Sequence, residues 1–184
     1  MLPAGYTPAA AIDLVNNKKQ FWTVNLFSLV LAAAAALPPV LLGAGEKYRL
    51  FSGRQLLHLA VCAVGLLLYI TLHELTHGAV MKACGASVRY GFRAAYAYAG
   101  SDAYFTRRAY IVIALAPVVL WGVLLGVLCV VLPAEWFWTV HLIQIVNLSG
   151  AAGDLFCAWR TLRSPRDTLV RDTGTAMTFY TRTH

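Results

Sequence analysis

Four long apolar runs divide the chain, and each is long enough to cross a bilayer as a helix. They cover residues 21–42, 56–81, 110–132 and 136–159, and a spanning helix needs about 20 predominantly apolar residues. The first and third runs carry no charged residue, whereas polar and ionisable residues interrupt the second and fourth. This pattern predicts an all-α membrane protein with four transmembrane helices. We expect a single polytopic domain over residues 1–184, in which residues 160–184 form a tail.

Lysine and arginine are distributed unevenly between the two ends of these helices. If the N-terminus is cytoplasmic, twelve of the fifteen lie on the cytoplasmic side, namely Lys18, Lys19, Lys82, Arg89, Arg93, Arg107, Arg108, Arg160, Arg163, Arg166, Arg171 and Arg182. The other side has only Lys47, Arg49 and Arg54. Because cytoplasmic loops are enriched in positive residues, we predict a multi-pass cell-membrane protein with both termini in the cytoplasm. The net charge of +7 then requires no nucleic-acid partner.

The composition agrees with a membrane protein. Hydrophobic residues make up 59% of the chain and charged residues 12%, against about 45–50% and 25% in ordinary globular domains. These values exclude an intrinsically disordered chain and argue against a soluble enzyme. The four cysteines form no C-x-x-C pair, so a disulfide framework is not expected.

Only two of the eight acidic residues lie within the apolar runs, Glu74 and Asp154. A charged side chain at membrane depth costs about 2.5–3.5 kcal/mol on insertion scales, so each is a candidate functional group. Glu74 belongs to an H-E-x-x-H motif, HELTH at residues 73–77. Residues four apart share one helix face, so His73 and His77 can bind one Zn²⁺ while Glu74 points beside it and suits a base for water. The alternative is that the three side chains only hydrogen-bond within a helix bundle.

Asp154 is the predicted third metal ligand. A catalytic zinc site generally has three protein ligands, so the third should come from another helix at the same depth. His77 lies five residues before Lys82, and Asp154 lies six residues before Arg160. Both are therefore about 8–9 Å along their helices from the basic residue that ends them, and both helices cross in the same direction. The alternative is that Asp154 caps its helix or pairs with Arg160 near the interface.

Asn147 lies seven residues before Asp154, almost on the same helix face. Two roles are open for its side chain: it can donate to a scissile carbonyl as a catalytic group, or it can orient a metal ligand. Small residues between the two, Gly150 and Gly153 among them, are expected to let another backbone approach closely. The remaining acids, including Asp172, lie in polar segments and are expected to be solvated.

Three segments together resemble a known family of small membrane proteins. HELTHG at residues 73–78, ALAP at 114–117 and NLSGAAGD at 147–154 look like the putative zincin peptidases, which are related to the site-2 protease class of intramembrane metalloproteases. The resemblance implies a zinc-dependent endopeptidase core of three helices that cuts peptide bonds at membrane depth. It also implies that His73, His77 and Asp154 bind zinc and that Glu74 is the catalytic glutamate. Site-2 proteases usually have Asp-Gly here with prolines before it, whereas Leu155 follows Asp154 and no proline precedes it nearby.

A shorter alternation of residues follows the second apolar run. Val88, Tyr90 and Phe92 alternate with Arg89, Gly91 and Arg93. This period of two predicts a short strand or hairpin after the zinc helix. In related proteases such a segment offers an edge to extended substrate, whose free backbone groups strand addition would satisfy. An interfacial hairpin with tyrosines at the lipid headgroups is the equal alternative.

The leading hypothesis is an intramembrane zinc endopeptidase. Zn²⁺ would be its cofactor, a membrane protein or peptide its substrate, and the lipid bilayer its surroundings. The alternative is a non-catalytic membrane adaptor or chaperone that retains a structural zinc site. A metal transporter would need polar residues along a crossing path, and the first and third runs offer almost none. The oligomeric state is not predicted.

Overall fold

A computed structural model describes residues 2–14, 16–43, 54–93, 96–174 and 176–182 of the chain. Lys47 and Arg49, which belong to the predicted outer loop, lie outside these residues. The chain divides into two compact units. The first, here called the sheet unit, comprises Met1–Val24, Glu74–Pro117 and Gly153–His184. The second, the helical unit, comprises Asn25–His73 and Val118–Ala152.

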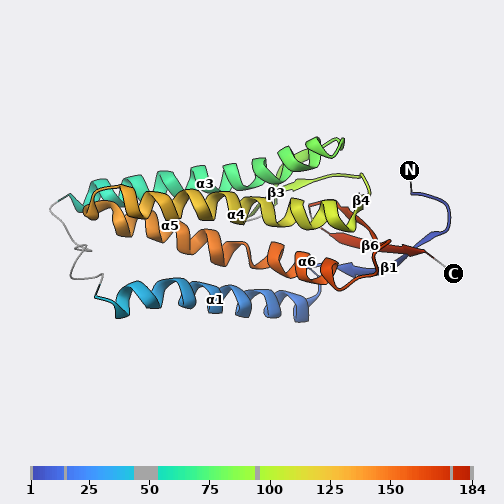
Figure 1. The fold of residues 1–184 in the computed structure, drawn as a ribbon, viewed down its shortest axis with the longest axis horizontal. Coiled ribbons are helices and arrows are strands. Elements are labelled where there is room, and N and C mark those ends of the chain that lie inside the picture. Colours follow the sequence, from blue (N-terminus) through green and yellow to red (C-terminus); the bar gives the residue numbers. More distant parts are fainter. Residues whose placement is uncertain (1, 15, 44–53, 94–95, 175, 183–184) are drawn as a thin grey trace. The chain divides into compact units, whose positions relative to one another are not determined.

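Four helical segments are long and apolar enough to cross a membrane, as predicted (Figure 1). They are α1 (Lys18–Leu41), α3 (Gln55–Ala83), α4 (Arg107–Val131) and the segment Ala134–Leu162. Helix α1 begins after Asn17, whose Oδ1 accepts a hydrogen bond from the Gln20 backbone N–H at 3.1 Å and so caps the first turn. No residue of α1 is buried within the protein, as expected of an apolar surface that lipid covers.

The fourth segment is not the single helix that was expected over residues 136–159. A short 3₁₀ turn (Ala134–Trp136) leads into α5 (Phe137–Gly150), and α6 (Ala152–Leu162) follows. Ala151 separates them with φ −75° and ψ 6°, outside helical values. The break occurs in the run of small residues before Asp154, and it puts Asp154 in the first turn of α6. A carboxylate is favourable there because the backbone N–H groups of a helix N-terminus carry partial positive charge.

Two small antiparallel sheets accompany the helices, so the protein is mostly helical and not all-α. The predicted hairpin after α3 is present as β2 (Arg89–Arg93) and β3 (Tyr96–Gly100). A second sheet, which was not predicted, has the strand order β1-β6-β5-β4. Its members are β1 (Tyr6–Ile12), β4 (Phe105–Thr106), β5 (Leu169–Asp172) and β6 (Met177–Arg182). Residues 160–184, expected to be a tail, thus include the end of α6 and two strands of this sheet.

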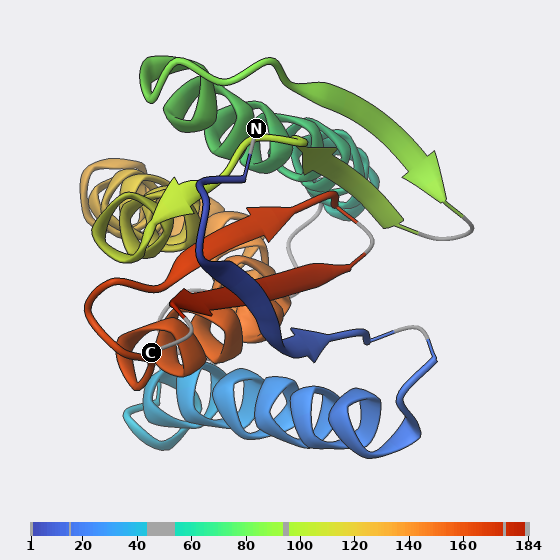
Figure 2. The same ribbon diagram turned by 90° about the vertical axis from the view of Figure 1, so that its right-hand side faces the viewer.

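The first and last strands of the chain are neighbours in the four-stranded sheet (Figure 2). Tyr6 pairs with Arg182, and Ile12 pairs with Met177. Backbone hydrogen bonds therefore join residues near both ends of the sequence. The strands nearest the two ends of the chain thus belong to one sheet, which the distribution of lysine and arginine predicts to lie on the cytoplasmic side.

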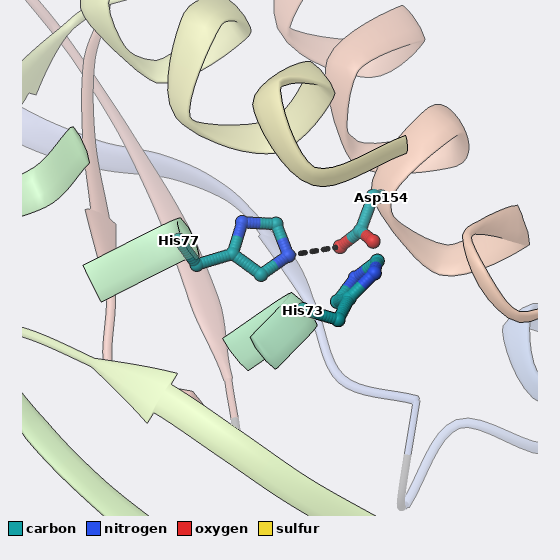
Figure 3. A group of neighbouring side chains, drawn as sticks. All are labelled: His73, His77 and Asp154. Carbon is teal, nitrogen blue, oxygen red and sulfur yellow. Dashed lines mark ion pairs between the residues drawn. The ribbon is translucent and has the colours of Figure 1, made fainter. Parts of the chain in front are cut away.

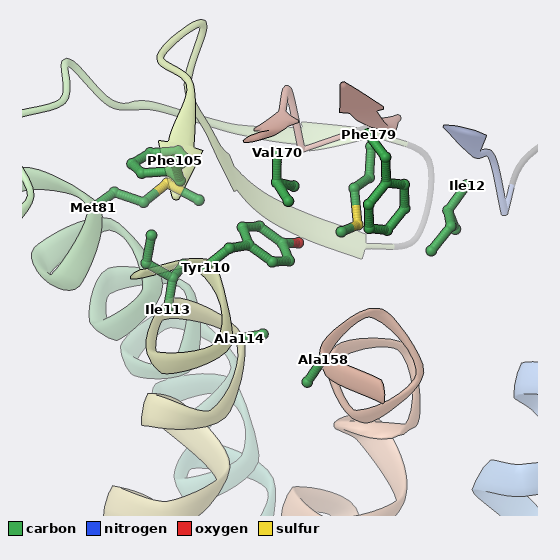
Figure 4. Close-up of a cluster of buried hydrophobic side chains, with 10 residues drawn as sticks. Ile12, Met81, Phe105, Tyr110, Ile113, Ala114, Ala158, Val170 and Phe179 are labelled. Atoms are coloured by element: carbon green, nitrogen blue, oxygen red, sulfur yellow. The ribbon is translucent and has the colours of Figure 1, made fainter. Parts of the chain in front are cut away.

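Each unit has its own hydrophobic core. In the sheet unit, the inward faces of the strands pack on the ends of α3, α4 and α6 (Figure 4). The residues of this core are Ile12, Met81, Phe105, Tyr110, Ile113, Ala114, Ala158, Val170, Met177 and Phe179. In the helical unit, Tyr69, Leu125, Val140 and Ile143 form a smaller cluster. The sheet core includes Met81 of α3 and Ile113 of α4, and the Ile113 carbonyl oxygen contacts His77 of the H-E-x-x-H motif.

Replacing Phe179 should show that β6 is part of the folded protein. Its side chain is 3% exposed, and removing a buried phenylalanine ring typically costs about 3–5 kcal/mol. We expect Phe179→Ala to lower the unfolding temperature in mild detergent clearly. Thr178→Ala, which changes the partly exposed neighbour on the other face of the strand, is the matched control and should have little effect. Equal melting of both variants and the wild type would mean that residues 177–182 are a tail after all.

Candidate metal centre

The H-E-x-x-H motif lies in the C-terminal part of α3, where both histidines are buried. The division between the two units falls inside this helix, between His73 and Glu74. The unbroken helix therefore places His73 one turn before His77, on the same face. This spacing brings the two rings together wherever the helix packs.

A backbone carbonyl of α4 holds the ring of His77. The Nδ1 of His77 lies 2.9 Å from the Ile113 carbonyl oxygen. A carbonyl can only accept, so Nδ1 carries the proton and the Nε2 lone pair is left for another partner. The carbonyl is available because residue 117 is proline, which has no N–H to donate to the residue four positions earlier. Pro117, the last residue of ALAP, thus allows α4 to set the tautomer of His77.

Asp154 faces the other nitrogen of the same ring. Its Oδ1 lies 3.4 Å from the Nε2 of His77, the distance of an ion pair when that nitrogen carries a proton (Figure 3). When the nitrogen is deprotonated, two acceptors face each other, and they repel unless a cation lies between them. The pair is therefore suited to binding a positive ion.

His73 completes a group of three donors. One ligand atom from each of His73, His77 and Asp154 lies within 4.8 Å of the others. Two imidazole nitrogens and one carboxylate oxygen form a donor set typical of catalytic Zn²⁺ sites, which leave a fourth position for water or substrate. The residues present therefore fit a zinc ion, and the three predicted ligands are brought together by the fold.

Glu74 is fixed by the hairpin. Its Oε2 accepts a hydrogen bond of 2.8 Å from the backbone N–H of Ala99 in β3. The hairpin also lies closely against α3 one turn later, because a Cβ atom on Gly78 would be 2.1 Å from the Tyr90 hydroxyl. The glycine after the motif therefore makes room for β2, and β3 then reaches the carboxylate. The sequence alone did not show either contact.

Asn147 is fully buried in α5, and its amide is hydrogen-bonded on both sides. Its Oδ1 accepts from the Tyr69 hydroxyl at 3.1 Å, and its Nδ2 lies 3.2 Å from the Gln144 Oε1 and 3.4 Å from the Val118 carbonyl oxygen. Tyr69 in turn lies 2.8 Å from the Nδ1 of His73. Sequence reasoning missed Tyr69 and Gln144. The signal for Tyr69 was its position four residues before His73 in the same apolar helix.

Comparison with known proteins agrees with this chemistry. A family model for putative zincin peptidases matches residues 66–169. The chain belongs to this family. The matched range, more than half of the chain, contains the two histidines, Glu74, Asn147 and Asp154. No curated protein and no solved structure matches the chain.

Asp172 is a further acidic residue of this zincin peptidase family member that sequence reasoning misplaced. It was expected to be solvated, but it is half-buried and lies beside the sheet core. Its carboxylate accepts hydrogen bonds from the Tyr110 hydroxyl at 2.5 Å and from the Gly174 N–H at 2.8 Å. Burial raises the pKa of this carboxyl above its ordinary value, and the two hydrogen bonds lower it in part. Asp172 is a single acidic residue in a polar segment, so the sequence does not indicate that it lies in a strand with its carboxylate directed toward Tyr110.

Removing the Asp154 carboxylate should weaken zinc binding. We expect Asp154→Ala to reduce the zinc affinity of the purified protein more than about 100-fold, beyond the usual cost of losing an outer-shell partner. The zinc affinity is measured from the metal content of the protein after equilibration with buffers that set a series of free zinc concentrations. Asp167→Ala, at an exposed position, is the control and should bind zinc as the wild type does. Unchanged zinc content in Asp154→Ala would exclude it as a ligand.

The raised pKa of Asp172 should appear in the pH dependence of stability. Because this pKa is higher in the folded than in the unfolded chain, the carboxyl favours folding most below its unfolded value of about 3.9. That contribution is lost as the pH rises through the folded pKa. The unfolding temperature of Asp172→Asn should therefore increase relative to the wild type as the pH is raised, with Asp167→Asn as the control. A constant difference across the pH range would contradict the assignment.

Proposed function

We propose that this protein is an intramembrane zinc endopeptidase, which hydrolyses peptide bonds of membrane-protein or membrane-associated peptide substrates. The proposal rests mainly on one observation, the juxtaposition of His77 and Asp154 beside the Glu74 of an H-E-x-x-H helix. Membership of the zincin peptidase family supports a metallopeptidase. The length and apolarity of α3 and α4 support a location at membrane depth.

His73, His77 and Asp154 are the residues that would hold the metal. Zn²⁺ bound there would supply Lewis acidity, which lowers the pKa of water and polarises a carbonyl group. The hydrogen bond from the His77 Nδ1 to Ile113 keeps that ring from rotating. Asp154 lies in the first turn of α6, where the helix N-terminus favours a carboxylate, and its Oδ1 faces the His77 Nε2 at 3.4 Å.

Glu74 is proposed as the general base. It follows His73 directly and precedes His77 by three residues, so the helix turns its side chain about 100° from His73 and about 60° from His77 around the axis, beside the donor set. The Ala99 N–H fixes the orientation of its carboxylate. Glu74 would remove a proton from the attacking water as the new C–O bond forms. It would then deliver that proton to the leaving amine nitrogen as the C–N bond breaks.

The hairpin is proposed to position the substrate. The Ala99 N–H is directed at Glu74, so this side of β3 lies next to the proposed base. An extended peptide added along β3 would satisfy its own backbone groups and bring its carbonyl toward Glu74. In the alternative, an interfacial hairpin, the Tyr90 side chain would lie at the lipid headgroups. In the structure its hydroxyl instead packs against α3 at Gly78. This contact favours a hairpin that is docked on the zinc helix.

Replacing the proposed base should separate catalysis from metal binding. Glu74→Gln should reduce peptide cleavage by about 10²–10⁴-fold, the usual contribution of a general base, and leave the zinc content unchanged. The assay reconstitutes the protein in liposomes with a mixture of single-span peptides, and mass spectrometry counts new amino termini. Glu135→Gln is the matched control at an exposed position. Cleavage by Glu74→Gln at the wild-type rate would refute the role, and a wild type that binds zinc without cleaving any peptide would favour the adaptor or chaperone.

A further inference from the structure

A chain of hydrogen-bonded polar side chains, buried at Asn147 and Tyr69 and partly buried at Gln144, links α4, α5 and α3 in the helical unit. It consists of Gln144, Asn147 and Tyr69, and it ends at His73. Polar groups are costly at this depth of an apolar helix, so a connected set of them calls for a function. We propose that these three residues form a positioning relay, which holds His73 in the tautomer whose Nε2 can bind a metal. The inference deepens the proposed function, since it takes His73 to be a zinc ligand.

The relay starts from two backbone carbonyls of α4, which can only accept hydrogen bonds. The Nε2 of Gln144 donates to the Gly122 carbonyl oxygen at 3.1 Å. The Oε1 of Gln144 must then face the other way, and it accepts from the Nδ2 of Asn147 at 3.2 Å. The same Nδ2 group donates to the Val118 carbonyl oxygen at 3.4 Å. The orientation of both amides is therefore determined, and the Oδ1 of Asn147 faces Tyr69.

The hydroxyl of Tyr69 passes this orientation on to the imidazole. A hydroxyl has one hydrogen, and that of Tyr69 is donated to the Oδ1 of Asn147 at 3.1 Å. Toward the Nδ1 of His73, 2.8 Å away, the same oxygen can only accept. The Nδ1 of His73 must therefore carry the proton, which leaves a lone pair on Nε2. The Ile113 carbonyl favours the same tautomer of His77. A backbone carbonyl for His77 and a tyrosine hydroxyl for His73 therefore both hold the proton on Nδ1.

The burial of the relay explains why it would be effective. Asn147 is 0% exposed and Tyr69 is 6% exposed, so bulk water does not compete for their hydrogen bonds. Both ends of the Asn147 amide already have partners within the protein, namely Tyr69, Gln144 and the Val118 carbonyl oxygen. Of the two roles that the sequence left open for Asn147, these contacts favour orienting a metal ligand. Asn147 would act through Tyr69, as a positioning residue.

The tautomer of His73 can be measured directly in the metal-free protein. Ring ¹⁵N shifts of ¹⁵N-histidine-labelled protein in detergent, at about pH 9, above the ordinary histidine pKa, report which nitrogen carries the proton. We expect the proton on Nδ1 in the wild type. In Asn147→Leu the Tyr69 hydroxyl loses its acceptor and turns to donate to His73, so the proton should move to Nε2. A merely structural role for Asn147 would not produce this exchange.

Zinc affinity provides the second measurement. Tyr69→Phe should lower it by about 10–100-fold, the usual cost of losing an outer-shell partner of a metal ligand. The matched control is Thr139→Val, which removes another buried hydroxyl that bonds the Nδ1 of a histidine in α3, at 3.0 Å from His58. Any general loss of packing between α3 and α5 should appear equally in the control. Melting curves of the metal-free variants verify that both are folded.

Two results would overturn the relay. One is a wild-type His73 with its proton on Nε2, and the other is a Tyr69→Phe variant that binds zinc as tightly as Thr139→Val. Failure of the proposed function would look different. A wild type that binds no zinc, yet has the Nδ1 proton and loses it in Asn147→Leu, would refute the zinc peptidase and support the hydrogen-bonded relay.

Discussion

The need to satisfy every polar group inside an apolar helix is the constraint on which the candidate metal centre depends. A buried donor or acceptor without a partner costs about 1–3 kcal/mol, and more if it is charged. Pro117 leaves the Ile113 carbonyl without its usual helical donor, and the Nδ1 of His77 takes that place. One hydrogen bond thus satisfies a carbonyl that proline leaves exposed and orients the ring that faces Asp154.

The positions of the Asp154 and Glu74 carboxylates depend on small residues, which break one helix and let a strand lie close to another. The run Gly150–Gly153 is where the fourth apolar segment breaks into α5 and α6, and the break puts the Asp154 carboxylate at a helix N-terminus. Gly78 has the corresponding effect in α3, because only a residue without a side chain lets Tyr90 lie against the helix there. The hairpin then reaches Glu74 through the Ala99 N–H. Local backbone geometry thus positions both carboxylates of the proposed site.

The parts of the fold that were predicted correctly are those with strong local patterns. Runs of more than 20 apolar residues were recognised as spans, and the alternation around Tyr90 was recognised as a strand. The four-stranded sheet was missed because its strands come from segments far apart in the sequence, and because β1, YTPAAAI, has no alternation of apolar and polar residues. Asp172 was misplaced for a related reason, since its burial depends on Tyr110 from a helix far away in the sequence.

The sequence by itself determined the four spans, the family resemblance and the pairing of His73 with His77, because these depend on helix length and on a spacing of four residues. Only the tertiary structure decided which nitrogen of each ring is left to bind a metal. The partners that decide it, Ile113 for one ring and Tyr69 with Asn147 for the other, are selected by how α3 packs on α4 and α5. The pairing of Tyr6 with Arg182 was likewise decided only by the tertiary structure. Contacts between distant residues leave no periodic trace in the sequence, so they became visible only in the folded chain.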